Sequence, residues 1–188
     1  MPDPGLLRKQ TLRNYDYSWG RLDGDPDMRS EFWRNNVADF LATQELCISP
    51  DWFRGRKVLD AGCGGGRWTY GLQKLGCEVT AFDASAAAVE HVRSNIAEDP
   101  ARIHHANIFE LPPEITDQRY DLVFSWGVLH HTGDTFRALS TIAPLMKPDG
   151  VLYVYLYGKR SWSPLKSFLV KASRVLLFPL PAGLKFSL

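Results

Sequence analysis

The sequence predicts a doubly wound α/β fold with a parallel sheet, and three observations support this prediction. Short apolar runs that suit buried strands alternate with segments of helical periodicity between Lys57 and Tyr155. The first of these runs ends in a glycine-rich turn, after which a helix begins. The chain has 188 residues, of which 45% are hydrophobic and 23% are charged, which is ordinary for a globular domain.

Residues 1–50 are expected to form an N-terminal arm and a helix on the lid and substrate side of the main domain, which spans 51–188. The arm carries an aromatic cluster at 15–19, which is typical of a lid that excludes water or, equally, of a packing anchor. A helix is predicted over 28–46, with Asp27 as its N-cap. Its apolar face has helical spacing and comprises Trp33, Val37, Phe40 and Leu41.

In the first half of the main domain, the sequence marks where one helix ends and where the next helix begins. Gly76 suits the left-handed position after a helix end, and Ser85 suits an N-cap. The short apolar run between them predicts a strand. The predicted order is therefore a strand at 57–61, a helix at 67–75, a strand at 78–82 and a helix at 85–95.

The second half supplies three more strands and one more helix. Pro144 ends this helix, because proline disrupts a helix interior. Alternating elements imply a parallel sheet with helices on both faces. We expect the strand order 3-2-1-4-5, because the glycine turn marks the switch point where strands one and four diverge. The elements are strands at 102–106, 120–125 and 150–155, and a helix at 135–145.

The strongest chemical signal is the glycine turn, which reads Asp60-Ala61-Gly62-Cys63-Gly64-Gly65-Gly66. Missing Cβ atoms allow positive φ angles and a close approach to a ligand, and the following helix N-terminus suits a carboxylate or phosphate. The spacing G-x-G-x-G differs from the dinucleotide pattern G-x-G-x-x-G. A carboxylate at Asp60 can hold a cationic amino group or order water. The alternative is a glycine-rich connection that binds nothing.

A second acid, Asp83, closes the second strand about 20 residues after the glycine turn. In a βαβ unit this position lets a carboxylate accept hydrogen bonds from both hydroxyls of a ribose. The alternative is an acid that caps the next helix. Ser85 is the better cap, so we favour the ribose contact.

Five segments, taken together, resemble the class I S-adenosylmethionine-dependent methyltransferases. The resemblance is closest to the small-molecule group called type 11, and it covers residues 56–155. Five motifs in the right order are far more specific than any one alone. The segments are Asp60–Gly66, Ala81–Ser85, Ala106–Pro112, Tyr120–His131 and Leu145–Gly150.

The resemblance implies a Rossmann-like fold, S-adenosylmethionine as cofactor, and in-line transfer of a methyl group to a small-molecule acceptor. Asn107 stands where the family usually has an aspartate near the adenine amino group, and its amide keeps an acceptor oxygen without the charge. The resemblance also implies that Gly62 and Gly64 line the methionine part, Asp83 binds the ribose and Ile108 packs on the adenine ring, with Ser125 and Trp126 beside the sulfonium. Asp60, Cys63 and Ala84 complete the predicted cofactor-binding set.

The pair His130-His131 has two interpretations. Histidine titrates near neutrality, so either side chain could act as a general base near the acceptor. The second interpretation, which we favour, is a structural pair that packs the loop after the fourth strand. No third ligand accompanies the pair, so we expect no metal site.

Too few residues follow Tyr155 for the helix, sixth strand and antiparallel seventh strand that the resemblance implies. The C-terminal strands are therefore expected to be shortened or missing. A basic amphipathic helix at 164–177 would cover the sheet, the alternative being peripheral contact with a membrane. An unprotected sheet edge beside an apolar helix face favours a homodimer.

The composition of the chain limits which partners, bound metals and cellular compartments are expected. The net charge of +1 does not favour nucleic acid as a binding partner. Three cysteines without a CxxC pair indicate neither a disulfide framework nor structural zinc. A cytoplasmic protein is therefore expected. No stretch is apolar over the length of a membrane span. Two rivals stay open: a non-catalytic cofactor-binding module that needs a partner, and a nicotinamide-dependent oxidoreductase, against which the glycine spacing and Asp60 argue.

Overall fold

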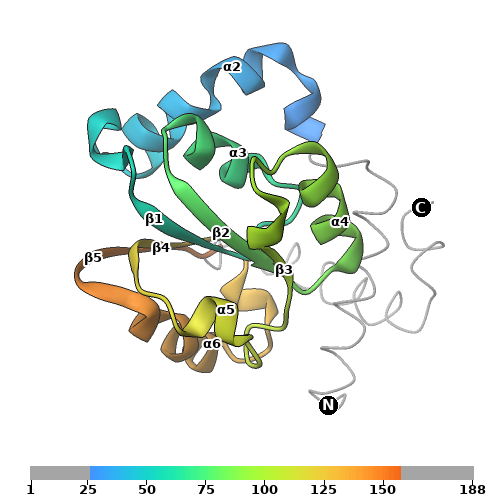
Figure 1. The fold of residues 1–188 in the computed structure, drawn as a ribbon, viewed down its shortest axis with the longest axis vertical. Coiled ribbons are helices and arrows are strands. Elements are labelled where there is room, and N and C mark those ends of the chain that lie inside the picture. Colours follow the sequence, from blue (N-terminus) through green and yellow to red (C-terminus); the bar gives the residue numbers. More distant parts are fainter. Residues whose placement is uncertain (1–25, 158–188) are drawn as a thin grey trace, which may run out of the picture. The chain divides into compact units, whose positions relative to one another are not determined.

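The computed structural model describes residues 26–157, and the described residues up to Leu156 belong to the first of two units of the chain. The first unit contains a sheet of five parallel strands in the order β3-β2-β1-β4-β5 (Figure 1). This confirms the predicted fold class and strand order. The strands are β1 (Lys57–Ala61), β2 (Glu78–Asp83), β3 (Ile103–His105), β4 (Tyr120–Trp126) and β5 (Met146–Tyr155).

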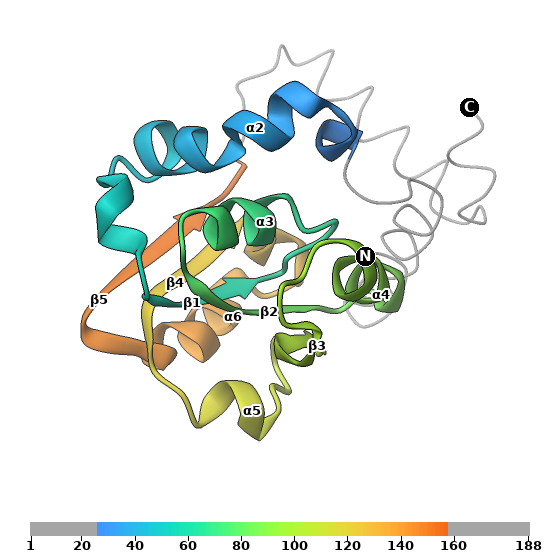
Figure 2. The ribbon, with the colours of Figure 1, turned by 45° about the horizontal axis from the view of Figure 1, so that its top comes forward.

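Helices cover both faces of the sheet, as the alternating elements predict (Figure 2). One face packs against α2 (Glu31–Phe40), α3 (Arg67–Lys74) and α4 (Ala86–Asn95). The other face packs against α5 (Pro113–Thr116) and α6 (Thr135–Ile142). Helix α5 has no signal in the sequence, because four residues are too few to show a helical period.

Each face of the sheet has its own apolar core. In β1, the side chain of Val58 packs toward α3 and α4, and that of Leu59 packs toward α6, and both are fully buried. Burial on both sides explains why the strands are continuous apolar runs rather than alternating ones. The first core also contains Val37, Leu41, Leu72, Val92 and Phe124, and the second contains Ile115, Val123, Leu129, Ala138 and Ile142.

The N-terminal helix differs from the prediction at both ends. A 3-10 turn, η1 (Pro26–Arg29), precedes it, and Ser30 is the N-cap, accepting a long hydrogen bond from the Trp33 N–H at 3.5 Å. The predicted cap at Asp27 is therefore wrong, because the chain is still in the 3-10 turn there. Helix α2 continues as a π-helical turn, η2 (Leu41–Glu45), in which the Leu46 N–H donates to the Leu41 carbonyl.

Strand β5 begins earlier than the apolar pattern indicates, at Met146 rather than at Gly150. Met146 pairs with Tyr120, and the register then shifts before Leu122 pairs with Val151. The irregular stretch accommodates the turn-forming residues 147–150 within the edge strand. Helix α6 ends at Ile142, and a 3-10 turn, η6 (Ala143–Leu145), follows it.

Several expectations concern residues outside the described range. These are the aromatic cluster at 15–19, the helix at 164–177 and the shortened C-terminal strands. Within residues 26–157, no helix combines the length and the apolar composition that crossing a bilayer would require.

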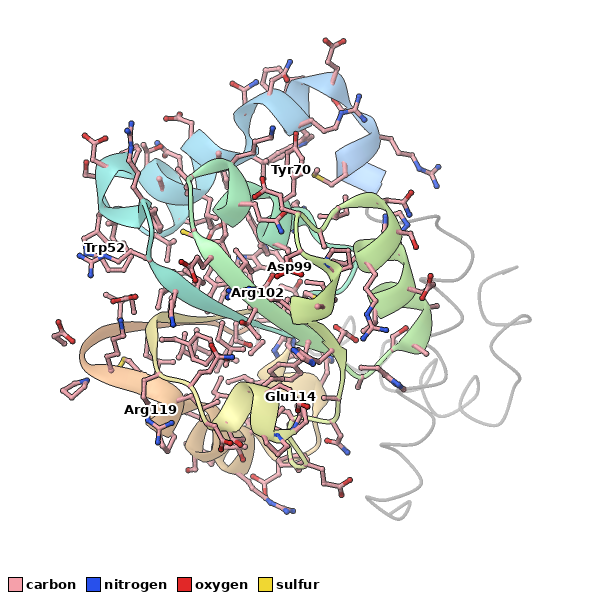
Figure 3. All side chains as sticks on the ribbon, in the orientation of Figure 1. Trp52, Tyr70, Asp99, Arg102, Glu114 and Arg119 are labelled. Carbon is pink, nitrogen blue, oxygen red and sulfur yellow. The ribbon has the colours of Figure 1, made fainter. Side chains whose placement is uncertain are left out.

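Charged side chains hold the short strand β3 at its amino end. Asp99 accepts from the Ala101 N–H at 3.1 Å and from Arg102 Nε at 3.2 Å, and the two labelled side chains lie together in Figure 3. From α4, Arg93 donates through both Nε (2.9 Å) and Nη2 (2.6 Å) to the Ile103 carbonyl. These contacts fix the start of the segment that leads to Asn107.

Asp121 joins three elements at the amino edge of the sheet. Its carboxylate accepts from the Lys57 N–H at 2.9 Å, from Lys147 Nζ at 2.9 Å and from Arg56 Nη1 at 3.2 Å. Burial raises the pKa of this carboxyl, but the hydrogen bonds from Lys147, Lys57 and Arg56 outweigh it, so that the net pKa is lowered. The carboxylate therefore ties β1 and β5 to β4.

We predict that Asp121→Asn lowers the free energy of unfolding by about 1.5–3 kcal/mol, the usual worth of hydrogen bonds to a charged group. Because the folded-state pKa is lowered, this stabilisation is present above pH 3.8 and is lost as the pH falls through the folded value. Urea unfolding at pH 7 and pH 3 measures both effects. Glu114→Gln on the surface of α5 is the control, and an equal loss in that variant would contradict the assignment.

Candidate functional site

The glycine turn leaves β1 at the carboxyl edge of the sheet, between β2 and β4. Gly62, Gly64 and Gly66 have φ angles of 87°, 50° and 85°, which side-chain-bearing residues rarely adopt. The N–H groups of Gly62 and Cys63 both donate to the Phe82 carbonyl, at 2.8 and 3.0 Å. The turn is thereby fixed against β2, and α3 begins directly after Gly66.

Gly62 is also required by packing. A Cβ atom at this position would lie 2.5 Å from Val128 Cγ2 and 2.9 Å from Val128 Cβ, in the loop after β4. The glycine therefore lets β1 and the segment after β4 approach more closely than two side chains would allow.

Asp60 lies beneath the turn and is 1% exposed. Its Oδ2 accepts from the Thr69 hydroxyl on α3 at 2.7 Å. Burial raises the pKa of Asp60 to about 7; the Thr69 hydrogen bond acts in the opposite sense, and the nearby Asp83 carboxylate adds to the rise. Near neutral pH this carboxyl is therefore poised between its neutral and ionised forms.

Asp83 ends β2 beside the glycine turn. One oxygen, Oδ2, accepts from the Gly64 N–H at 2.9 Å, and the other, Oδ1, accepts from the Ser85 N–H at 2.8 Å. Burial raises the pKa of Asp83, against the effect of backbone hydrogen bonds from Ser85, Gly64 and Ala84. Each oxygen keeps a second lone pair, so the carboxylate can still accept from a pair of ligand hydroxyls.

The segment after β3 lies next to Asp83, because Asp83 pairs with His105 across the sheet. A ring nitrogen of His105 lies 3.2 Å from the Ala84 carbonyl. Further on, Asn107 Oδ1 accepts from the Phe109 N–H at 3.1 Å, and Ile108 is 7% exposed in the second core. The amide oxygen of Asn107 is thus already engaged in its own turn.

The end of β4 carries Ser125 and Trp126, which differ in accessibility. Ser125 is fully buried, and its hydroxyl donates to the Ala61 carbonyl at 2.9 Å, so it links β4 to β1. Trp126 is partly buried and stacks on Tyr155 with ring centroids 4.7 Å apart. The Arg67 guanidinium lies over the Trp126 ring, 5.2 Å from its centroid.

Sequence reasoning missed Glu45, which contacts this end of the sheet from the π-helical turn η2. Glu45 Oε2 accepts from the Tyr153 hydroxyl at 2.6 Å and from Trp126 Nε1 at 3.3 Å. Burial and the Glu45 carboxylate raise the pKa of Tyr153. The contact links residues far apart in the chain, so no local motif in the sequence indicates it.

The two histidines lie in a 3-10 turn, η5 (Leu129–His131), after β4. Their ring centroids are 3.9 Å apart, with His130 partly buried and His131 exposed. Burial lowers the pKa of His130, which favours its neutral form. Among residues 26–157, no group of three His, Cys, Asp or Glu side chains is placed to hold a metal ion.

The structure brings most of the predicted site residues to one edge of the sheet. Asp60 lies near the end of β1 and Gly62, Cys63 and Gly64 follow that strand, whereas Asp83 ends β2 with Ala84 directly after it. Trp126 ends β4, and the carboxyl ends of these parallel strands meet at one edge. Ser125 turns its hydroxyl into the sheet instead. The arrangement offers one buried and one half-buried carboxylate, glycine backbone and an aromatic ring at the same edge of the sheet.

Comparison with known proteins assigns the chain to a protein family. The family model described as a methyltransferase domain matches residues 59–154. A ubiquinone biosynthesis O-methyltransferase of Chelativorans sp. (strain BNC1) is 29% identical over 158 residues, covering 83% of this chain and 60% of that protein. A protein of the same name from Alkalilimnicola ehrlichii is 32% identical, covering 69% of this chain and 52% of its own length. The chain thus spans little more than half of these relatives.

Among solved structures, the magnesium protoporphyrin IX methyltransferase of Synechocystis PCC 6803 with bound SAM superposes with a TM-score of 0.58. The sequence identity is 21%, and the match covers 91% of this chain and 84% of that one. At this identity the likeness establishes the shared fold.

We predict that Gly62→Ala destabilises the protein by about 1–3 kcal/mol, because the new Cβ meets Val128 and the positive φ is strained. Chemical denaturation measures the loss. Gly133→Ala is the matched control, since Gly133 has a φ of 85° and nothing within 4 Å of a Cβ. The difference between the two variants isolates the contact with Val128, and equal losses would show that this contact contributes nothing.

A second prediction concerns pH. Because the folded-state pKa of Asp60 is raised, its contribution to stability is present below pH 3.8 and is lost as the pH rises toward about 7. For one titrating group, the free energy of unfolding changes by at most about 1.4 kcal/mol per pH unit. Urea unfolding of Asp60→Asn between pH 5 and pH 7.5 should therefore show a flatter profile than the wild type. Asp51→Asn, at an exposed acid, is the control and should leave the profile unchanged.

Proposed function

The chain belongs to the methyltransferase-domain family, and from that premise we propose that it is an S-adenosylmethionine-dependent methyltransferase acting on a small molecule. One observation carries the proposal: a glycine turn with three positive φ angles lies between Asp60 and Asp83 at the switch point of the sheet. This donor set fits the cofactor, which has a cationic amino acid end and a ribose with two hydroxyls.

In this proposal the methionine part of the cofactor lies along the backbone of Gly62, Cys63 and Gly64. The absence of Cβ atoms at the two glycines permits that approach. Asp60 lies beneath the turn as the partner for the ammonium group, directly or through water. The helix that starts after the turn adds N–H groups that favour the carboxylate.

The nucleoside part would lie over the ends of β2 and β3. The two oxygens of Asp83 accept from the ribose hydroxyls while keeping their bonds to the turn. The adenine ring packs on Ile108, near Ala84, and its amino group meets the side chain of Asn107. Since the Asn107 oxygen already accepts from the Phe109 N–H, we expect a weak contact there.

The acceptor side is proposed at the end of β4. Trp126 presents a ring there, whereas Ser125 contributes through the backbone, because its hydroxyl is bonded to the Ala61 carbonyl. Within residues 26–50, Glu45 contacts Trp126 and Tyr153, and this contact supports our placing the N-terminal part of the chain on the acceptor side. The relatives named as O-methyltransferases support an oxygen atom as the acceptor.

The chemistry asks little covalent participation of the protein. S-adenosylmethionine supplies an activated methyl group on a sulfonium. The chain's own residues align the acceptor with it and exclude water, and alignment alone can supply about 7–11 kcal/mol of the barrier. If the acceptor must first lose a proton, His130 is suited to accept it, because burial keeps its ring neutral.

We predict that S-adenosylmethionine and its demethylated product, S-adenosylhomocysteine, bind the wild-type protein in calorimetry. Asp83→Ala should weaken binding by about 1.5–3 kcal/mol, because two charge-assisted hydrogen bonds are lost. Asp51→Asn, at an exposed acid that takes no part in the proposed site, is the control. An unchanged affinity in Asp83→Ala would remove this residue from the ribose contact. A screen for methyl transfer with wild-type protein then separates an enzyme from a binding module that transfers nothing.

A further inference from the structure

The surroundings of Asp60 contain a neutral donor and a second acid. The Thr69 hydroxyl is its hydrogen-bond partner at 2.7 Å, and Thr69 is itself fully buried. Asp83 is close enough for its charge to disfavour ionisation of Asp60, and burial disfavours it further. None of the cations in the described part of the chain is among the groups that set this ionisation.

The charged groups of α3 are directed elsewhere. The Arg67 guanidinium lies over the Trp68 and Trp126 rings, 4.6 and 5.2 Å from their centroids. Lys74 Nζ lies over the Tyr70 ring at 5.3 Å. In the turn between β1 and α3, burial raises the pKa of the Cys63 thiol, which is therefore neutral.

On the neighbouring strands, the other charged groups lie at the far edge or face Asp83. Glu78 of β2 pairs with Lys57 in register and binds Arg102. Asp121 of β4 lies at the amino edge with Arg56 and Lys147. His105 of β3 lies beside Asp83 and contacts the Ala84 carbonyl.

We propose that Asp60 is a neutral carboxylic acid in the ligand-free protein and releases its proton when the ammonium group of the cofactor binds beside it. Thr69 is the positioning residue, since its hydroxyl orients and supports the carboxylate that results. The step balances simply: the carboxyl O–H bond breaks, the proton passes to solvent, and the ammonium keeps its three protons. The inference rests on the proposed function and adds the release of one proton to the equilibrium of cofactor binding.

The energetics favour this exchange. Burying a carboxylate without a neighbouring cation costs its full hydration free energy, whereas attraction to an adjacent ammonium group offsets much of that cost. The pKa of about 7 in the ligand-free protein means that only a modest attraction is needed to complete ionisation at neutral pH. Ligand binding below pH 7 is therefore coupled to proton release.

The test uses S-adenosylhomocysteine, which carries the ammonium but no sulfonium. Calorimetric titration of the full chain in buffers of different ionisation enthalpy gives the number of protons released. We expect close to one proton per ligand at pH 6 and close to none at pH 8.5. The affinity should rise by up to about tenfold per pH unit from pH 5.5 to 7 and level off above about 8.

Variants of Asp60 and Thr69 identify the group that releases the proton. Asp60→Asn keeps the shape and an acceptor oxygen but cannot titrate, so it should bind more weakly and release no proton. Thr69→Val removes the hydrogen bond that favours ionisation, so proton release should extend to higher pH. Thr69→Ser retains the hydroxyl and should restore the wild-type profile.

The outcomes are distinct. No binding of S-adenosylhomocysteine at any pH would overturn the proposed function and this inference with it. Binding of equal affinity at pH 5.5 and pH 8 without proton release would overturn the inference alone. Proton release that persists in Asp60→Asn would assign it to another group, such as His105. If Asp60→Asn does not fold, the wild-type profile and the two Thr69 variants still decide.

Discussion

The carboxyl edge of the sheet depends on one constraint, the lack of space at Gly62. The backbone there lies against the side chain of Val128, so β1 and the loop after β4 approach closely. The N–H groups of Gly62 and Cys63 can then both reach the Phe82 carbonyl on β2. This places the glycine turn above Asp60 and brings the Gly64 N–H to Asp83. The close approach at Gly62 thus contributes to the site geometry together with the positive φ angles of Gly64 and Gly66.

Two buried aspartates at opposite edges of the sheet illustrate how the environment assigns a role. Asp121 accepts from two cations and a backbone N–H, and its pKa is lowered, so it stabilises the fold as a carboxylate. Asp60 has one hydroxyl donor and a neighbouring acid, and its pKa is raised. A fold gains nothing from such a group by itself. In the proposal above, the ammonium group of the cofactor supplies the missing charge.

Much of the fold could be predicted from local signals. Strand 57–61 is both apolar and followed by glycines, so its bounds and its place in the sheet follow from the sequence. The site's location was predictable too, since carboxyl ends of parallel strands meet at one edge. What could not be predicted depends on contacts between distant residues: the bond from Ser125 to Ala61, and that from Trp126 to Glu45. The N-cap at Ser30 also depends on a preceding 3-10 turn that leaves no pattern.

The π-helical turn η2 shifts the phase of the N-terminal helix relative to an uninterrupted α-helix. Such turns correspond to one residue more than the α-helical geometry accommodates. The Glu45 carboxylate lies in this turn and contacts Tyr153 and Trp126. Deleting one residue from the turn would rotate the end of the helix by about 100° and carry Glu45 away from the sheet. A relative with an uninterrupted α-helix at this place would therefore need another acceptor for its tryptophan, or another residue in place of that tryptophan.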